Sequence, residues 1–345
     1  KLSQSKPQLS LHNHVVHNMN KIFAYIIIFL TLTACSKDDG IDNNEIQITN
    51  DNIDIQLTNV EFGIADIDFI DNNNGFLIDY QGRILKTENS GINWNLLQTT
   101  NYELLDIQFT TEQYGYVLAK IQNEQSYFLL KTSDYGESFQ ETPIPNGSDL
   151  RKIYITSNNV GFVLGNHILK TDDNGSSWTE LNLDFNVWGD LIEKSNGAIY
   201  ACGLNGTFIK STDTGTNWEQ INLGINSHLY QIQPFQDIFY FRGQSITKTN
   251  IGTTQEFEIP AYILDFKVYN ENIVIGFGEQ YSEQGFYPRG AMYISNNSGN
   301  NWETTIFNEF NRIRIVDFID SNNGFGIADD LFSGKEYLIK IKIEE

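Results

Sequence analysis

The sequence predicts an all-β protein in which seven four-stranded antiparallel sheets form a closed ring. Three observations lead to this prediction. An eight-residue turn motif recurs along most of the chain with a spacing of about 40 residues. Between the turns, apolar and polar residues alternate over short runs, and no window keeps a helical period. A spare β segment, Glu45–Leu57, precedes the first repeat and can close the ring.

The recurring motif is Ser/Thr-x-Asp/Asn-x-Gly-x-x-Trp/Phe, which we call the box turn. With 27 Gly, 23 Phe and 5 Trp in 345 residues, composition alone predicts about two accidental Gly-x-x-aromatic pairs. A degenerate copy ends at Phe257, and successive closing aromatics are 39 to 45 residues apart, as in repeat architectures. The five full copies are Thr87–Trp94, Thr132–Phe139, Thr171–Trp178, Ser211–Trp218 and Ser295–Trp302.

Each recurring residue type in the box turn has a structural role. The Asp or Asn side chain accepts hydrogen bonds from backbone N–H groups, and the Gly two positions later adopts positive φ without a steric clash. The aromatic residue anchors the turn against the neighbouring sheet. We assign these roles to Asn89, Gly91, Trp94, Asp134, Gly136, Phe139, Asp173, Gly175, Trp178, Asp213, Gly215, Trp218, Asn297, Gly299 and Trp302.

These motifs resemble the Asp-box, or BNR, repeat of sialidase-like β-propellers, in which the box links the third and fourth strands of a blade. Over roughly residues 45–345 the chain looks most similar to the photosystem II stability and assembly factor family of propellers. The resemblance implies a seven-bladed β-propeller and a scaffolding role. It implies nothing about photosynthesis in this chain.

The blades follow from matching Asp68–Phe76 with Asp317–Phe325, two nearly identical segments near the two ends of the repeat region. The last unit shows only three strands, so we expect Glu45–Leu57 to pair with Tyr337–Ile343 as its fourth. Without this closure two apolar blade faces would be exposed. Rings of six or eight blades remain alternatives to seven. The seven units begin near Ile64, Leu104, Leu150, Asp190, Leu229, Ile263 and Arg314.

The N-terminal segment has the pattern of an export signal. We interpret residues 1–18 as an upstream extension and residues 19–34 as a signal peptide with an apolar core, too short to span a membrane. The Leu-Thr-Ala-Cys sequence ending at Cys35 resembles a bacterial lipobox, which implies lipidation of Cys35. An ordinary signal peptide with an incidental Cys is the alternative.

A polar linker, residues 35–44, then leads into the propeller at residues 45–345. The Lys-Asp-Asp sequence that follows Ser36 resembles the surface-export signal of Bacteroidota lipoproteins. These resemblances imply a location in the cell envelope, anchored by lipid to the outer membrane and exposed at the surface. The membrane is contacted only through that anchor.

Charge excludes one class of partner. After loss of Lys1, Lys6 and Lys21 with the leader, 19 basic residues face 44 acidic ones, a net charge of −25. A surface of this sign repels phosphates and anionic lipid headgroups, so we expect no nucleic-acid binding. An ordinary solvated surface would also explain this excess of acidic residues. Cys202 lies in an apolar run, where it is most simply a small buried hydrophobe.

The sequence places any ligand site on the propeller face opposite the box turns, which carries the connections from the second to the third strand and from blade to blade. The longest insertion there is Gly276–Gly290, which is either a solvated loop or a binding loop. Aromatic and Arg side chains are enriched in binding hot spots. The candidate ligand-binding residues are Tyr102, Trp188, Arg242, Tyr281, Phe286, Tyr287, Arg289, Arg312 and Arg314.

We predict a monomeric, non-catalytic module that binds a protein or a glycan. The alternative is a glycoside hydrolase, sialidase-like, or a lyase on the same scaffold. A sialidase resemblance would require three Arg side chains converging on one pocket with a Tyr–Glu pair, but the Arg-Ile-Pro signature is absent. His and Cys at metal-ligand spacing are also lacking. No catalytic residue, metal site or cofactor is therefore predicted.

Overall fold

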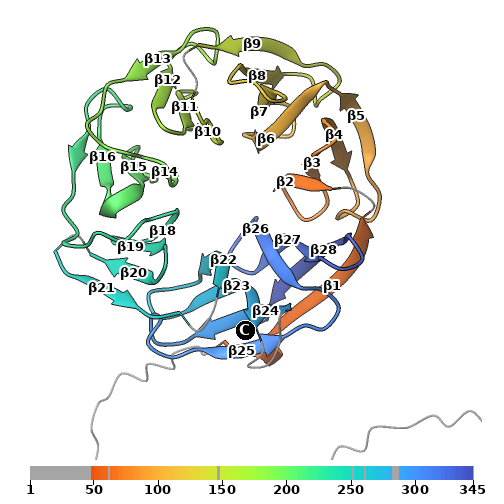
Figure 1. Cartoon of the computed structure of the whole chain (residues 1–345), viewed down its shortest axis with the longest axis vertical. Helices are drawn as coiled ribbons and strands as arrows, with labels where there is room; N and C mark the ends of the chain where they lie inside the picture. Colours follow the sequence, from red (N-terminus) through yellow and green to blue (C-terminus); the bar gives the residue numbers. More distant parts are fainter. Residues whose placement is uncertain are drawn as a thin grey trace, which may run out of the picture. The chain divides into compact units, whose positions relative to one another are not determined.

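Seven four-stranded antiparallel sheets are arranged around a ring in residues 46–345 (Figure 1). The computed structural model describes residues 48–60, 63–145, 148–250, 252–259, 262–281 and 287–344. Within these ranges the helical elements are two short 3-10 turns, η1 (Asn50–Asn52) and η2 (Leu204–Gly206). The predicted seven-bladed, all-β propeller is confirmed. The predicted leader, Cys35 and the linker lie outside the described residues.

We call the strands of each blade a to d, from the centre of the ring outward. Blade 1 contains β2 (Ile64–Phe69), β3 (Gly75–Asp79), β4 (Arg83–Thr87) and β5 (Asn95–Thr99). Blade 2 contains β6 (Tyr102–Phe109), β7 (Gly115–Ile121), β8 (Tyr127–Thr132) and β9 (Gln140–Ile144). Blade 3 contains β10 (Lys152–Ile155), β11 (Gly161–Leu164), β12 (Ile168–Thr171) and β13 (Thr179–Leu181).

The next three blades repeat this order. Blade 4 contains β14 (Leu191–Glu193), β15 (Ile199–Cys202), β16 (Phe208–Ser211) and β17 (Glu219–Gln220). Blade 5 contains β18 (Gln231–Phe235), β19 (Ile238–Arg242), β20 (Ile246–Thr249) and β21 (Thr254–Phe257). Blade 6 contains β22 (Tyr262–Val268), β23 (Val274–Tyr281), β24 (Pro288–Ser295) and β25 (Glu303–Ile306).

Blade 7 is built from both ends of the propeller. It contains β26 (Arg312–Phe318), β27 (Asn323–Asp330), β28 (Lys335–Ile343) and, as its outer strand, β1 (Ile53–Val60). The two strands pair antiparallel in a register that runs from Ile53 opposite Ile343 to Val60 opposite Glu336. The predicted closure is therefore confirmed. The closing strand begins later than the predicted Glu45–Leu57, because η1 occupies the residues just before it.

The apolar core is divided into seven layers, one at each interface between neighbouring blades. Blades 1 and 2, for example, enclose Phe76 and Val117, and blades 7 and 1 enclose Phe325 and Leu77. The other five interfaces each contain a cluster of the same kind. Each blade therefore buries both faces on its neighbours, which explains why the ring must close.

Side chains on the inner strands join each blade to the next around the centre of the ring. The carboxylate of Asp106 accepts a hydrogen bond from the Ile153 N–H at 2.7 Å, and that of Asp317 accepts one from the Phe69 N–H at 2.7 Å. Strand a is an edge strand, so its backbone groups would otherwise lack protein partners. The same type of contact is made by Asp66, Asp68, Gln108, Asp190, Gln233 and Asp265.

Burial raises the pKa of five of the inner carboxyl groups, those of Asp66, Asp68, Asp106, Asp265 and Asp317. The pKa of Asp317 rises to about 6, and burial places the pKa values of Asp68 and Asp106 well above the ordinary range. The charge of Asp317 contributes to the shift at Asp68. Lys152 offsets part of the negative charge at the centre of the ring through an ion pair with Asp190, in which Nζ lies 2.7 Å from Oδ1.

All five box turns adopt one hydrogen-bond pattern. In the first, the Thr87 hydroxyl donates to Asn89 Oδ1 at 3.0 Å and accepts from the Gly91 N–H at 2.9 Å. The Asn89 side-chain oxygen also accepts from the Asn93 N–H at 2.9 Å. Equivalent bonds hold the turns that begin at Thr132, Thr171, Ser211 and Ser295.

The residue before the box glycine is also left-handed, which the sequence motif did not predict. Ser90 has φ 60° and Gly91 has φ 77°, and the other four turns have the same pair of positive values. The preceding residues there are Tyr135, Asn174, Thr214 and Ser298. Each box turn therefore contains two successive left-handed residues, of which only the second is glycine.

Candidate functional site

Two faces of the ring differ in the connections that they carry. The box face carries the turns from strand a to b and the box turns between strands c and d. The loop face carries the connections from strand b to c and from blade to blade. Successive strands of each sheet are antiparallel neighbours, which fixes this assignment.

All six Arg residues of the chain lie at loop-face ends of strands. They belong to blades 1, 3, 5, 6 and 7. Most strand-end Lys residues, such as Lys86, Lys170 and Lys210, lie at the box-face ends of their strands. In a chain with a formal net charge of −22, the loop face therefore concentrates the guanidinium groups. The six are Arg83, Arg151, Arg242, Arg289, Arg312 and Arg314.

Three of these guanidinium groups are neutralised within the protein. Arg83 Nε lies 2.6 Å from Asp79 Oδ2. Arg312 and Arg314 both bind Asp329, with Nε to Oδ distances of 2.7 and 2.8 Å. Arg314 also reaches Glu336 at 2.9 Å. These contacts fasten the loop-face ends of blades 7 and 1.

A sialidase-like carboxylate clamp is not assembled in this arrangement. The Tyr281 hydroxyl does donate to Glu279 Oε1 at 3.3 Å, and the charge of Glu279 raises the pKa of Tyr281. The nearby Arg312 and Arg314, however, both point to Asp329. A Tyr–Glu pair is therefore present among the described residues, but Arg312 and Arg314 already bind a carboxylate of the protein.

The other three Arg side chains form no ion pair with a carboxylate in the described part of the chain. Arg151 stacks on the ring of Trp188, 3.3 Å from Cζ to the ring centroid. Arg242 contacts Gln231 Oε1 at 3.2 Å and lies 5.7 Å from the ring centroid of Tyr230. The third, Arg289, is exposed and has only a 3.4 Å contact with an amide oxygen, that of Asn308.

Exposed aromatic side chains gather on the loop face of blades 6, 7 and 1. The rings of Tyr287 and Phe332 meet edge to face with centroids 4.6 Å apart, and those of Tyr262 and Tyr281 meet at 5.8 Å. Ten large hydrophobic residues are strongly exposed in the described part of the chain, and six of them belong to this surface. We call it the aromatic patch: Tyr80, Tyr262, Tyr281, Tyr287, Leu331 and Phe332.

The remaining predicted ligand residues are placed as follows. Tyr102 lies at the loop face but is half-buried, with its ring 5.1 Å from Phe128 and its hydroxyl donating to Glu141 at 2.9 Å. Burial and this hydrogen bond raise the pKa of Tyr102. Phe286 lies outside the described residues. The predicted set is therefore divided between the aromatic patch, the internal ion pairs and separate sites on blades 2 to 5.

The interpretation of Gly276–Gly290 as one long loop was wrong. Strands β23 and β24 extend into it, and Tyr281 pairs with Pro288. The glycines of this segment are required by close packing: a Cβ on Gly278 would stand 1.9 Å from the Tyr262 carbonyl oxygen. Similarly, a Cβ on Gly276 would meet the Ile263 side chain at 2.5 Å.

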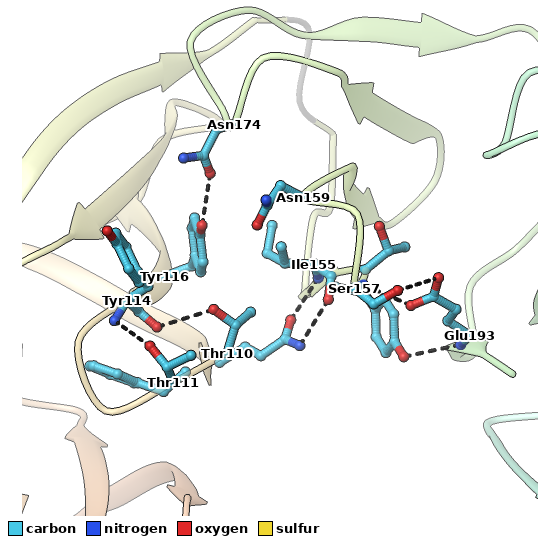
Figure 2. Close-up of a pocket in the computed structure, with 13 residues that line it drawn as sticks. Thr110, Thr111, Tyr114, Tyr116, Ile155, Ser157, Asn159, Asn174 and Glu193 are labelled. Atoms are coloured by element: carbon cyan, nitrogen blue, oxygen red, sulfur yellow. Dashed lines mark hydrogen bonds between the residues drawn. The ribbon is translucent and has the colours of Figure 1, made fainter. Parts of the chain in front are cut away.

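A pocket of about 800 Å³ lies on the box face, between the inner parts of blades 2 and 3, with Glu193 of blade 4 at its rim (Figure 2). Its polar lining comes from the turns after β6 and β10 and from the box turn of blade 3. The sequence-based choice of the loop face missed this pocket. The signal was weak, since short polar turns such as Thr110–Tyr114 also connect strands a and b in other blades.

Within the described part of the chain, no group of three or more His, Cys, Asp and Glu side chains is arranged to hold a metal ion. Likewise, no helix among those residues is both long and apolar enough to cross a membrane. Cys202 is a buried free thiol whose pKa burial raises, in the position expected of a small hydrophobe.

Comparison with known proteins gives matches to propellers. No curated protein sequence matches the chain. The fold is similar to that of YCF48 bound to D1 peptide, with 18% identity and a TM-score of 0.62 over 85% of this chain and 97% of that one. YCF48 from Cyanidioschyzon merolae has 16% identity and a TM-score of 0.58, over 84% of this chain and 98% of that one.

An enzyme is also among the similar structures. The GH74 enzyme of Niastella koreensis has 17% identity and a TM-score of 0.57, over 79% of this chain and 53% of that one. At such identities the likeness concerns the fold alone. In sequence, residues 92–254 match the DUF6242 beta propeller domain. The chain is thus a seven-bladed β-propeller whose residues from the first box turn to blade 5 are similar to the DUF6242 beta propeller domain.

Proposed function

We propose that the protein is an exported, lipid-anchored propeller that binds a protein partner through its loop face and catalyses no reaction. The observation that carries this proposal is the aromatic patch beside Arg289. Large exposed apolar residues gathered on one face mark interaction sites. Tyr and Arg are also the residue types that contribute most to protein–protein binding.

The chemistry of this surface favours an extended peptide with apolar and acidic side chains. Tyr262, Tyr281, Tyr287 and Phe332 expose ring surface that apolar side chains can cover. The Arg289 guanidinium is exposed, and its contact in the described part of the chain is with the neutral amide oxygen of Asn308 at 3.4 Å. A carboxylate on the partner would give it a charge-assisted hydrogen bond. YCF48, which has the same fold, has been observed bound to a peptide.

A peptide-display selection with the immobilised full-length protein tests the proposal. We expect enriched peptides to combine aromatic or aliphatic residues with Asp or Glu. The double variant Tyr287→Ala, Arg289→Ala should bind them at least about tenfold more weakly, because each truncation removes a hot-spot residue. Binding should also weaken with salt.

The matched control is Ile92→Ala with Tyr135→Ala, two large exposed side chains on the box face, 67% and 49% exposed. This control should bind selected peptides like the wild type, and both double variants should keep the wild-type melting temperature. Equal peptide binding by the wild type and the Tyr287, Arg289 variant would contradict the proposal.

The proposed anchor and monomeric state have separate tests. Cys35→Ala should abolish incorporation of labelled fatty acid and move the protein from the membrane fraction to the soluble fraction of the producing cells. The purified protein without its leader should have the mass of one chain in light scattering, because every blade face is covered within the ring. Fatty-acid labelling that survives Cys35→Ala would exclude Cys35 as the lipidation site.

A further inference from the structure

We propose that the pocket on the box face of blades 2 and 3 binds a neutral, hydroxyl-rich ligand, namely a short uncharged glycan. This site is separate from the aromatic patch, which lies on the opposite face of the ring. Its volume of about 800 Å³ lies within the range of small-molecule sites.

Three Tyr side chains line the pocket: Tyr114 and Tyr154 offer ring surface with polar tips, whereas Tyr116 is buried, 1% exposed. Tyr116 donates its hydroxyl hydrogen to Asn174 Oδ1 at 2.7 Å, and Tyr154 accepts from the Glu193 N–H at 3.0 Å (Figure 2). Both rings are thereby fixed in orientation. Tyr114, 42% exposed, stands at the edge of the pocket. A pyranose ring presents C–H groups on its faces and hydroxyls around its rim, which suits fixed aromatic walls of this kind.

Amide and hydroxyl groups provide hydrogen bonds that the protein leaves open. Asn174 uses its Oδ1 for Tyr116, and its amide N–H groups bind no other described residue. The side chain of Asn159 makes no hydrogen bond within the described part of the chain and lines the same pocket. An amide offers both donors and an acceptor, which matches the donor and acceptor character of a sugar hydroxyl.

The charge of the lining selects against anions. None of the thirteen described residues that line the pocket is Lys, Arg or His, and the one ionisable acid is Glu193. Its carboxylate already accepts from the Ser157 N–H at 2.7 Å and the Ser157 hydroxyl at 2.9 Å. A phosphate, sulfate or sialic acid group would find no cation among the described lining residues, and the nearby Lys131 already donates to the Asn174 carbonyl oxygen at 3.2 Å, so the lining favours an uncharged ligand.

The base of the pocket is rigid. Gln108 accepts from the Ile155 N–H at 2.7 Å and donates to the Ile155 carbonyl oxygen at 3.2 Å, which locks the inner strands of blades 2 and 3 together. Both the oxygen and the nitrogen of the Gln108 side-chain amide are thus hydrogen-bonded within the protein. A site on locked strands needs little ordering on binding, which lowers the entropic cost of capturing a polar ligand.

The test uses the full-length protein on an array of neutral, sialylated and sulfated oligosaccharides, followed by titration calorimetry with the best neutral binder. We expect binding to neutral glycans, weakened at least about tenfold in Asn159→Gly. Asn159 has φ 61°, so glycine keeps the backbone conformation and removes only the amide. Tyr114→Ala should weaken binding similarly.

Asn123→Gly is the matched control, because Asn123 has φ 62° and lies between β7 and β8 on the loop face. It should bind glycan like the wild type, as should the Tyr287→Ala, Arg289→Ala variant, which separates this site from the proposed protein-binding surface. Three results would overturn the proposal: no neutral glycan bound, preference for sialylated or sulfated glycans, or wild-type affinity in both Asn159→Gly and Tyr114→Ala.

Discussion

Gly91 of blade 1 lies directly against Leu338 of blade 7, and a Cβ built on Gly91 would stand 2.0 Å from Leu338 Cδ2. The same relation recurs between the other box glycines and the preceding blade. Gly136 faces Leu97, Gly175 faces Leu129, Gly215 faces Phe162 and Gly299 faces Phe257. The box turn therefore closes a hairpin in one blade and seats that hairpin on the blade before it.

This contact predicts that Gly91→Ala destabilises the ring more than an equivalent change elsewhere. Gly197 is the control, since it has the same φ of 77° but a Cβ added there would have nothing within 4 Å. Alanine in left-handed backbone costs about 1–2 kcal/mol at either site. Overpacking against the buried Leu338 should add about 1–3 kcal/mol at Gly91 only. Urea unfolding measures the difference, and equal costs would show that the contact relaxes freely.

The box turns also show how far the sequence could predict this structure. Their period gave the blade number, and the missing strand after Tyr337–Ile343 correctly predicted closure by the N-terminal segment. Hydrophobic alternation and turn composition are local signals, and they suffice where a fold repeats one local unit. The blade 6 hairpin was misjudged because Gly276 and Gly278 are needed for close approach to strand β22, a tertiary contact.

The candidate site was predicted less well for the same reason. Residue type identified Tyr287 and Arg289 as exposed on the loop face, where the structure places both. From the sequence, Arg312 and Arg314 were as good candidates for ligand binding as Arg289. In the structure both form ion pairs with Asp329 of the neighbouring strand. The box-face pocket depends on how turns from different blades face each other, which no local pattern encodes.

Closure by β1 predicts a specific effect of truncation. Removing residues up to Val60 deletes the outer strand of blade 7 and withdraws the buried Ile48, with Ile53 and Ile55, from the core layer between blades 6 and 7. One fully buried and two partly buried Ile side chains contribute about 3–5 kcal/mol. We expect a melting temperature lower by roughly 5–10 °C. The control is a protein that begins at Ile46, and it should have the same melting temperature as the full-length chain.

A synthetic peptide covering residues 46–60 should restore the melting temperature of the truncated protein, because it can pair with the free edge of β28. The recovery should depend on peptide concentration, as for any ligand that binds only the folded state. If the protein that lacks residues up to Val60 has the same melting temperature as the protein beginning at Ile46, strand β1 does not stabilise the ring.

The raised pKa of Asp317 predicts a pH dependence with a definite sign. Burial raises this pKa from 3.8 to about 6. Between these values the folded protein binds more protons than the unfolded chain, so stability falls as the pH rises from about 4 to 6 and then levels off. Asp317→Asn keeps an acceptor for the Phe69 N–H, bonded at 2.7 Å in the wild type, and cannot ionise.

The Asn variant should therefore match the wild type near pH 4 and exceed its stability by about 1–2 kcal/mol at pH 7, after allowance for partial hydration of the side chain. Unfolding by urea at several pH values measures both curves. Parallel curves for the two proteins would mean that Asp317 does not titrate in this range.

The left-handed residue before each box glycine predicts a stabilising substitution in blade 4. Thr214 has φ 57°, an unfavourable conformation for a β-branched residue, whereas Asn tolerates it. Asn already occupies the corresponding position at Asn174, with φ 59°. Thr214→Asn should raise the free energy of unfolding by about 0.5–1 kcal/mol, even though it removes the hydroxyl bond to the Asp213 carbonyl oxygen. Thr216→Asn, two positions on and without positive φ, is the control and should change the stability little. A Thr214→Asn protein no more stable than the control would show that the strain is relieved within the turn.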